Sequence, residues 1–235
     1  MSNDGFMDFT FGSGDDNVEK KSKRFKGKEG ETYRVSFVWL TKNDDGEEVV
    51  RFTGCERHYV QGVGYFLHKG PEYAALAGGP AKQAVASVIV VWPTDRAGRL
   101  NKEAFAKGEG FEVMPWVFSG ERYTQLKLRN EQFPLAEFDL IMACSDSQYQ
   151  KMDLSPCRES LFLKLAKSGN ERGEAIAKSI LDEVELIVKG IRNEMARDLS
   201  LDQIREKMTG TAPSTPVSSG AVENVDGLLD NLLDD

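Results

Sequence analysis

Apolar residues at every second position predict the first strand of the fold. In "TYRVSFVWL" (32–40), apolar side chains fall at every second position from Tyr33 to Trp39, with Arg34 and Ser36 between them. Successive side chains of a strand point to opposite faces, so this alternation is typical of a strand with one buried face. The segment "VVRFTGCERHYV" (49–60), which follows a turn-like stretch, is predicted to return as the next strand.

A continuous apolar run predicts the centre of a sheet. The segment "AVASVIVVW" (84–92) is rich in β-branched residues, as in strands that are buried on both faces, and Pro93 ends it because proline has no N–H to donate. Two further strands are predicted in "FEVMPWVFS" (111–119), where Pro115 should interrupt the ladder, and in "FDLIMACS" (138–145).

In the last third of the chain, the spacing of the apolar residues changes to that of a helix. Apolar residues recur there at intervals of four and three, which predicts one amphipathic helix. They are Ile176, Ile180, Val184, Ile187, Ile191 and Met195. A second, short helix is predicted in "SLDQIREKM" (200–208), where Ser200 is a suitable N-cap and Gln203 completes a capping box. Between the strands, "ERYTQLKLRNEQ" (121–132) fits one or two helical turns.

These elements divide the chain into four parts. We predict a flexible basic N-terminal arm (1–30), a core of short strands (31–157), a helical segment (158–209), and a linker with a disordered acidic Asp/Leu tail (210–235). The class is mainly β with α (α+β). Short strands, turns and one internal helix suit a small barrel, so we expect an OB-fold-like β-barrel core.

Charge is unevenly distributed along the chain. The formal net charge is −8, but residues 20–28, "KKSKRFKGK", carry six basic side chains and no acid. Residues 211–235 carry five acids and no Lys or Arg. A basic segment near the front and an acidic one at the back indicate two separate interaction segments.

Composition argues against several classes of protein. We expect no membrane span, because no apolar run approaches about 18 residues. The N-terminal segment lacks the basic-then-apolar order of a signal peptide. Three cysteines do not suggest a disulfide framework, so we expect a reducing cytoplasm.

Motifs for catalysis and for metal binding are weak. The chain has no phosphate-binding glycine loop and no pattern of an activated nucleophile, so we predict that it is not an enzyme. Cys55, His58 and His68 could contribute to a zinc site, but a structural site needs four ligands and usually more sulfur. We therefore expect no cofactor, with Cys55 as a small core residue.

Binding of single-stranded nucleic acid requires cations for the phosphates and aromatic rings for the bases. The predicted core supplies both kinds of side chain. The candidates are Arg51, Arg57, Tyr59, Tyr65, Lys69, Arg122, Tyr123, Lys127 and Arg129. Phe37 and Phe52 are assigned to the core, whereas Tyr59, Tyr65 and Tyr123 fit either a core position or an exposed one.

Three segments resemble one known family. They are "SVIVVWPTDRAG" (87–98), "LAEFDLIMACSDSQYQKMDLSPC" (135–157) and the tip "VDGLLDNLLDD" (225–235). Together with the basic segment, they are similar to the single-stranded DNA-binding proteins of tailed phages, the T-even-like helix-destabilising family. The resemblance implies that Tyr149 lies against the DNA. It also implies that a basic arm supports cooperative binding between neighbours; its residues here are Lys20, Lys21, Lys23 and Arg24. That family's zinc ligands include three cysteines in the barrel, a set this chain lacks.

The resemblance implies two roles for the acidic tip. Without DNA, the aspartates compete for the basic DNA site; with DNA bound, the freed tip recruits replication, recombination and repair proteins. Its residues are Asp226, Leu228, Leu229, Asp230, Leu232, Leu233, Asp234 and Asp235. Leucines offer apolar anchors to a partner's groove, whereas a plain solubility tail would not need them.

The resulting prediction is a protein that coats single-stranded DNA without strong sequence preference, in the cytoplasm of an infected host cell. Self-association along the DNA is expected from the arm. Two alternatives stay open: a phage transcription cofactor that binds melted promoters and recruits RNA polymerase, and an RNA-binding module.

Overall fold

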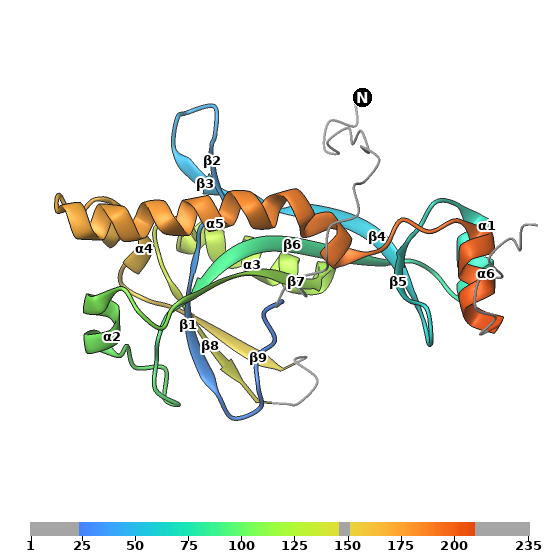
Figure 1. Ribbon diagram of the computed structural model, residues 1–235, viewed down its shortest axis with the longest axis horizontal. Helices are drawn as coiled ribbons and strands as arrows, with labels where there is room; N and C mark the ends of the chain where they lie inside the picture. The colour runs from blue at the N-terminus through green and yellow to red at the C-terminus, as the bar shows by residue number, and fades with distance from the viewer. Residues whose placement is uncertain (1–23, 146–150, 210–235) are drawn as a thin grey trace, which may run out of the picture.

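The computed structural model describes residues 24–145 and 151–209. Seven strands form the main, mostly antiparallel sheet: β1 (Thr32–Phe37), β4 (Thr53–Val60), β5 (Gly64–Leu67), β6 (Lys82–Val91), β7 (Glu112–Ser119), β8 (Leu140–Cys144) and β9 (Met152–Pro156). Strands β2 (Leu40–Lys42) and β3 (Glu48–Val50) form a separate hairpin. The helices are α1 (Pro71–Ala77), α2 (Lys102–Lys107), α3 (Gly120–Gln132), α4 (Leu161–Ala166), α5 (Glu171–Met195) and α6 (Leu201–Thr209). Figure 1 shows α5 lying across β6 and β7.

Strand β6 is the centre of the sheet, as its apolar sequence predicts. On one side it pairs with β4 over its first half and with β1 over its second half, and on the other side it pairs with β7. Both of its faces are buried. Ala84, Ala86, Val88 and Val90 face one apolar cluster with α4 and α5. Val85 and Ile89 face a second cluster.

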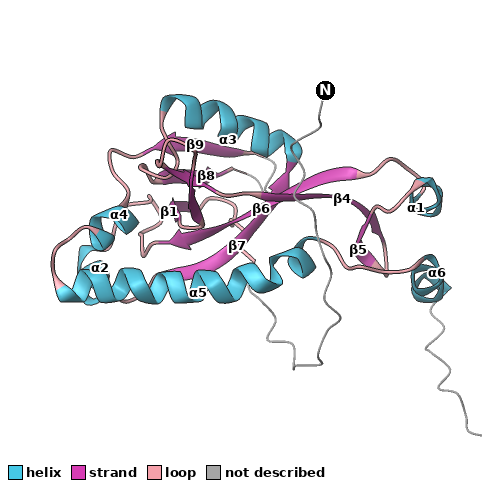
Figure 2. Ribbon diagram, turned by 90° about the horizontal axis from the view of Figure 1, so that it is seen from above, coloured by secondary structure: helices cyan, strands magenta, loops and turns pink. Residues whose placement is uncertain are grey.

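The second cluster lies on the face of the sheet opposite α5. It joins β1, β6, β7, β8 and β9 to Leu126 of α3, which is fully buried. Figure 2 shows α3 and α5 on opposite sides of the strands. The alternation predicted for β1 is confirmed, because Val35 and Phe37 enter this cluster while Arg34 and Ser36 point away from it.

The α+β class is confirmed, but the expected closed barrel is not. The strand path is β5-β4-β6-β1-β8-β9 with β7 on the other side of β6, and no ladder joins β7 to β9 within the residues that the structure describes. The outer edge of β7, which a closing strand would need, faces the segment that precedes β1. Phe25 N–H donates to the Pro115 carbonyl at 2.9 Å, and the Phe25 ring is buried against Trp116.

Pro115 does not interrupt β7, contrary to the prediction from sequence. It pairs in register with Val88 of β6. The N and the C=O of one strand residue point to the same side, and the Pro115 carbonyl points outward to Phe25. The missing N–H therefore lies on the outer edge of β7, where the ladder with β6 does not need it.

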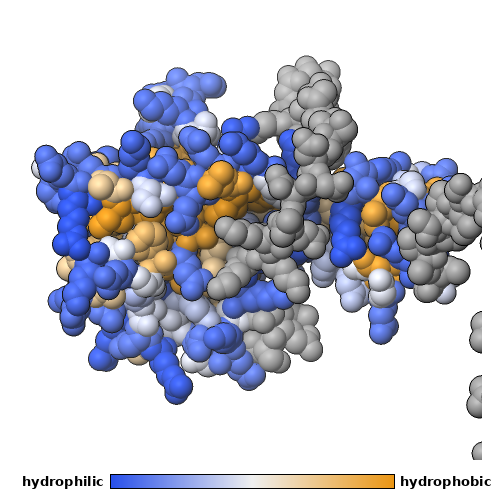
Figure 3. All heavy atoms as spheres, viewed as in Figure 1, coloured by the Kyte–Doolittle hydropathy of each residue, from blue (hydrophilic) through white to orange (hydrophobic). Residues whose placement is uncertain are grey.

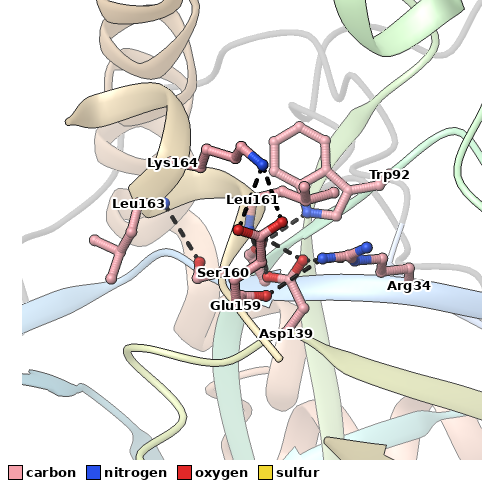
Figure 4. Close-up of polar contacts among 9 residues, drawn as sticks. Arg34, Trp92, Asp139, Glu159, Ser160, Leu161, Leu163 and Lys164 are labelled. Carbon is pink, nitrogen blue, oxygen red and sulfur yellow. Dashed lines mark hydrogen bonds and ion pairs between the residues drawn. The ribbon is translucent and has the colours of Figure 1, made fainter. Parts of the chain in front are cut away.

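A buried carboxylate ties α4 to the sheet (Figure 4). Asp139 is fully buried and accepts from Arg34 Nε at 2.8 Å, from the Ser36 hydroxyl, and from the Leu161 N–H at 3.1 Å. Trp92 Nε1 donates in turn to Ser36 Oγ at 2.7 Å. Burial raises the pKa of Asp139, and the three donors act against that rise.

A smaller substructure, which we call the wing, projects from the end of the sheet. It consists of the β4–β5 hairpin, α1 and α6, and it has its own small core, with Val63, Phe66, Tyr73, Leu199 and Ile204 buried. The predicted capping box of α6 is confirmed. Gln203 N–H donates to Ser200 Oγ at 3.3 Å, and Ser200 N–H donates to Gln203 Oε1 at 2.8 Å.

Candidate nucleic-acid interface

Two tyrosines lie side by side on the exposed face of the β4–β5 hairpin. Tyr59 and Tyr65 are directly opposite in the ladder, their ring centroids are 5.0 Å apart, and the residues are 59% and 41% exposed. The adjacent pair, His58 and Phe66, faces the other way and is buried in the wing. The alternation of the strand therefore holds both tyrosine rings at the surface.

The Arg57 side chain packs against the ring of Tyr65. Its guanidinium carbon lies 3.8 Å from the centroid of the Tyr65 ring, and its Nη1 donates to the Met195 carbonyl at 2.6 Å. Met195 is the last residue of α5, so Arg57 satisfies a carbonyl that the helix leaves unpaired. Burial lowers the pKa of Arg57. Arg57 therefore holds Tyr65 in place rather than standing free for a phosphate.

Lys82 adds a positive charge next to the tyrosines. It is exposed and lies opposite Arg57 in the ladder between β4 and β6, so both side chains are on one face. We call Tyr59, Tyr65, Arg57 and Lys82 the tyrosine platform. Lys69, also predicted as a site residue, follows β5 and forms an ion pair with Asp198.

A groove between α3 and β9 forms a second cationic surface. Its volume is about 700 Å³. Its lining comprises Arg122, Gln125, Leu128, Arg129, Gln132, Ser145, Lys151, Met152, Asp153 and Leu154. Arg122 Nη1 donates to the Met152 carbonyl at 2.9 Å and thereby joins α3 to β9. Arg129 and Lys151 are exposed, so the groove offers positive charge to an anionic ligand.

The helix that carries this groove is longer than the sequence suggested. α3 runs over 13 residues, and the Ser119 hydroxyl caps its N-terminus by accepting from Arg122 N–H at 3.3 Å. The predicted site residue Lys127 lies on the same helix and is exposed, but it does not line the groove.

Three other predicted site residues are engaged in the fold. Tyr123 packs against the core, with its ring 5.2 Å from that of Phe52. The Arg51 guanidinium lies 5.4 Å from the centroid of the Trp39 ring. Arg24 Nε forms an ion pair with Glu194 of α5 at 2.7 Å.

The remaining predicted residues lie outside the described part of the chain. They are Lys20, Lys21, Lys23, Tyr149, Asp226, Leu228, Leu229, Asp230, Leu232, Leu233, Asp234 and Asp235. By sequence, Tyr149 belongs to the five residues that join Ser145 to Lys151, both of which line the α3–β9 groove.

The three candidate zinc ligands do not converge on one point. His58 Nε2 and His68 Nδ1 are 2.9 Å apart and share a hydrogen bond. Cys55 lies three positions before His58 in β4, so the two side chains leave opposite faces of the strand. Within residues 24–145 and 151–209, no group of three or more His, Cys, Asp or Glu side chains could hold a metal ion.

Sequence reasoning missed Lys82 and Lys151. Lys82 joins the tyrosines only through the register between β4 and β6, and Lys151 joins the groove only because β9 packs beside α3. Neither relation leaves a local pattern in the sequence.

The platform and the groove are on opposite faces of the sheet. Cys55 and Arg57 share a face of β4; Cys55 packs in the cluster of α5, and Arg57 bonds to the end of α5. α3 packs on the other face through Leu126. The predicted site residues therefore form two surfaces and not one continuous track.

On the face that carries α5, apolar surface appears as separate patches among hydrophilic residues (Figure 3). Among the described helices, none is both long enough and apolar enough to cross a membrane. No protein-family model, no curated protein and no solved structure matches the chain.

Proposed function

We propose that this protein binds single-stranded DNA without strong sequence preference. The observation that carries the proposal is the exposed pair Tyr59–Tyr65, which Arg57 supports and Lys82 flanks. Every base has a π-face, so a pair of exposed rings with cations nearby suits unpaired bases of any sequence. A duplex keeps its bases stacked inside and offers only its edges to such a surface.

The topology supports the proposal that the core is an OB-type barrel left open at one seam. The strands β7-β6-β1-β8-β9 are neighbours in this order, and α3 connects β7 to β8. This arrangement is similar to the five-stranded OB-fold, whose helix joins its third and fourth strands. OB-folds bind oligonucleotides on the face of strands 2 and 3 and with adjacent loops.

Helix α5 changes where such a core can bind its ligand. Its buried residues Ile180, Val184 and Ile191 belong to the apolar cluster on the outer face of β6, which would be strand 2 of the barrel. A strand of DNA cannot use that covered face. The tyrosine platform lies just beyond the C-terminal end of α5, where the sheet is exposed again.

For the biological role, we propose coating of single strands during phage DNA replication, recombination and repair. This role rests on the resemblance of the tip and of the segment 135–157. Under the same proposal, the acidic tip recruits partner proteins, and the arm at 20–24 supports self-association along DNA. The transcription alternative would use the same DNA contact with a different partner at the tip.

Titration of fluorescent oligomers by anisotropy tests the proposed activity. Single strands should bind more tightly than a duplex of equal length. The double variant Tyr59→Leu/Tyr65→Leu should weaken binding by about 1–3 kcal/mol for each base that loses its stacking partner. The matched variant Tyr59→Phe/Tyr65→Phe keeps both rings and should bind like the wild type. Equal affinity of the wild type for single strands and duplex would refute the proposal.

A further inference from the structure

The tyrosine platform and the α3–β9 groove differ in chemistry. The platform presents two exposed rings, with one of its two cations, Arg57, engaged beneath Tyr65. The lining of the groove includes Arg129, Lys151, one acid (Asp153) and the exposed Leu128, and it contains no aromatic side chain among its described residues. Stacking depends little on salt, whereas ion pairs with phosphates weaken as salt rises.

The position of the two surfaces excludes a straight path between them. The platform is on the face of the sheet that carries α5, and the groove is on the face that carries α3. Figure 2 shows these helices on opposite sides of the strands, with the β4–β5 hairpin at the end of the sheet. A ligand that touches both surfaces must therefore pass around an edge of the sheet.

We propose that one single strand of DNA is held at two sites on opposite faces of the sheet, by base stacking on the tyrosine platform and by phosphate contacts in the α3–β9 groove. This inference rests on the proposed function and adds the path of the strand. A flexible single strand can follow such a bend, whereas a stiff duplex cannot. Short oligomers occupy one site, and only a longer strand reaches both.

Three double variants separate the two contacts. Tyr59→Leu/Tyr65→Leu removes the stacking surface, and Arg129→Gln/Lys151→Gln removes two charges from the groove. Lys178→Gln/Lys189→Gln removes the same charge from exposed positions of α5 and serves as the control. Each variant is first checked for an unchanged melting temperature, and Tyr59→Phe/Tyr65→Phe provides a second platform variant that retains the rings.

Affinity is measured against salt for oligomers of about 4 and about 16 nucleotides, the range of site sizes for an OB-fold. On the long oligomer, the platform variant should bind at least about fivefold more weakly with an unchanged salt slope. The groove variant should also bind more weakly, and its salt slope should fall by about 0.7 for each phosphate that the groove no longer neutralises. On the short oligomer, only one of the two variants should lose affinity.

The outcomes distinguish the inference from the function on which it rests. If both variants weaken short and long oligomers by the same factor, the two surfaces act as one site and the inference is wrong. If only one variant affects the long oligomer, or if the α5 control lowers the salt slope as much as the groove variant, the inference is also wrong. In each of these cases the proposed binding of single strands stands. Failure of the wild type to bind either oligomer would overturn the proposed function itself.

Discussion

Asp139 is the only buried acid among the residues that the structure describes, and two elements donate hydrogen bonds to its carboxylate. Arg34 and Ser36 reach it from β1, and the Leu161 N–H, the first of α4, donates to it from the other side. A buried charge without partners is strongly destabilising, so these donors offset the cost of burying the Asp139 carboxylate. The carboxylate fixes α4, and the chain continues from α4 into α5.

Asp139→Asn should lower the free energy of unfolding by about 3 kcal/mol, because it leaves Arg34 without its charged partner in a largely buried site. Urea denaturation of the variant and the wild type measures the difference. The control is Glu159→Gln, which removes an exposed ion pair with Lys164 and should change stability by no more than about 0.5 kcal/mol. Similar losses in both variants would contradict the assigned role of Asp139.

His58 should make the stability of the wing depend on pH. It is buried, and burial followed by the proximity of His68 lowers its pKa from the ordinary value of 6.5. A group whose pKa is depressed in the folded state contributes stability above its unfolded pKa and loses it as pH falls through the folded pKa. Acidification below about pH 6.5 should therefore destabilise the wing.

The variant His58→Gln tests this expectation. Between pH 7.5 and pH 5, the wild type should lose more unfolding free energy than His58→Gln, because the glutamine does not titrate. His68→Gln should retain most of the pH dependence, since burial is the main cause of the shift at His58. Parallel pH profiles for the wild type and His58→Gln would show that another group is responsible.

At the scale of elements, long patterns were predictable and short ones were not. The alternation of β1, the apolar run of β6 and the stripe of α5 each span enough residues to show their period. α1, α2 and α4 have six or seven residues, which is too few to establish a helical period. Pro115 misled the prediction because the side of a strand that faces solvent is set by its neighbours and not by its own sequence.

The wing should be less stable than the main sheet and the helices packed on it. Its core has five buried residues, of which α6 contributes only Ile204, while Leu199 lies in the segment just before the helix. Regions with few buried apolar contacts open with a lower free energy than the rest of a protein. The tyrosine platform is built on the hairpin of this region, so its geometry depends on the order of the wing.

Ser200→Ala should weaken α6 by about 1 kcal/mol, because it removes the side-chain acceptor of the capping box. Native-state hydrogen exchange should show faster exchange in 201–209, with unchanged rates in β6 and β7. Ser179→Ala, at an exposed position inside α5, is the matched control and should leave the exchange of α6 unchanged. Equal exchange of α6 in all three proteins would show that tertiary packing alone holds the helix.

At the scale of the whole molecule, the sequence offered candidate site residues but not their arrangement. Lys and Arg interleaved with tyrosines predicted a nucleic-acid surface, and Tyr59 and Tyr65 are exposed as that prediction requires. The division into two faces follows from strand order and from the packing of α5, both of which are long-range. Alternation along β4 could not reveal which of its faces α5 would cover.

The acidic tip contributes more than half of the net negative charge of the chain. Deleting residues 221–235 removes five acids and no basic residue, so the formal net charge changes from −8 to −3. We expect tighter binding to single strands, most visibly at low salt, because electrostatic competition is screened as ionic strength rises. The four changes Leu228→Ser, Leu229→Ser, Leu232→Ser and Leu233→Ser keep the charge, so they should spare this effect while abolishing capture of partner proteins.

Anisotropy titrations at two salt concentrations and co-purification of partner proteins from cells that express the protein measure these two effects separately. An affinity that is unchanged by the deletion at every salt concentration would show that the tip does not compete with DNA. Capture of the same partners by the serine variant would show that the leucines are not anchors.

The outer edge of β7 is protected against pairing with a neighbouring copy of the protein. An open strand edge is a template on which another chain can add a strand, and many molecules crowded on one DNA strand would meet such edges often. Here Phe25 occupies the edge, and Pro115 removes a donor from its middle, so an added strand would lack one ladder hydrogen bond there even if Phe25 detached. If the protein coats DNA as proposed, this protected edge would let neighbouring copies assemble on a strand and dissociate from it without pairing edge to edge.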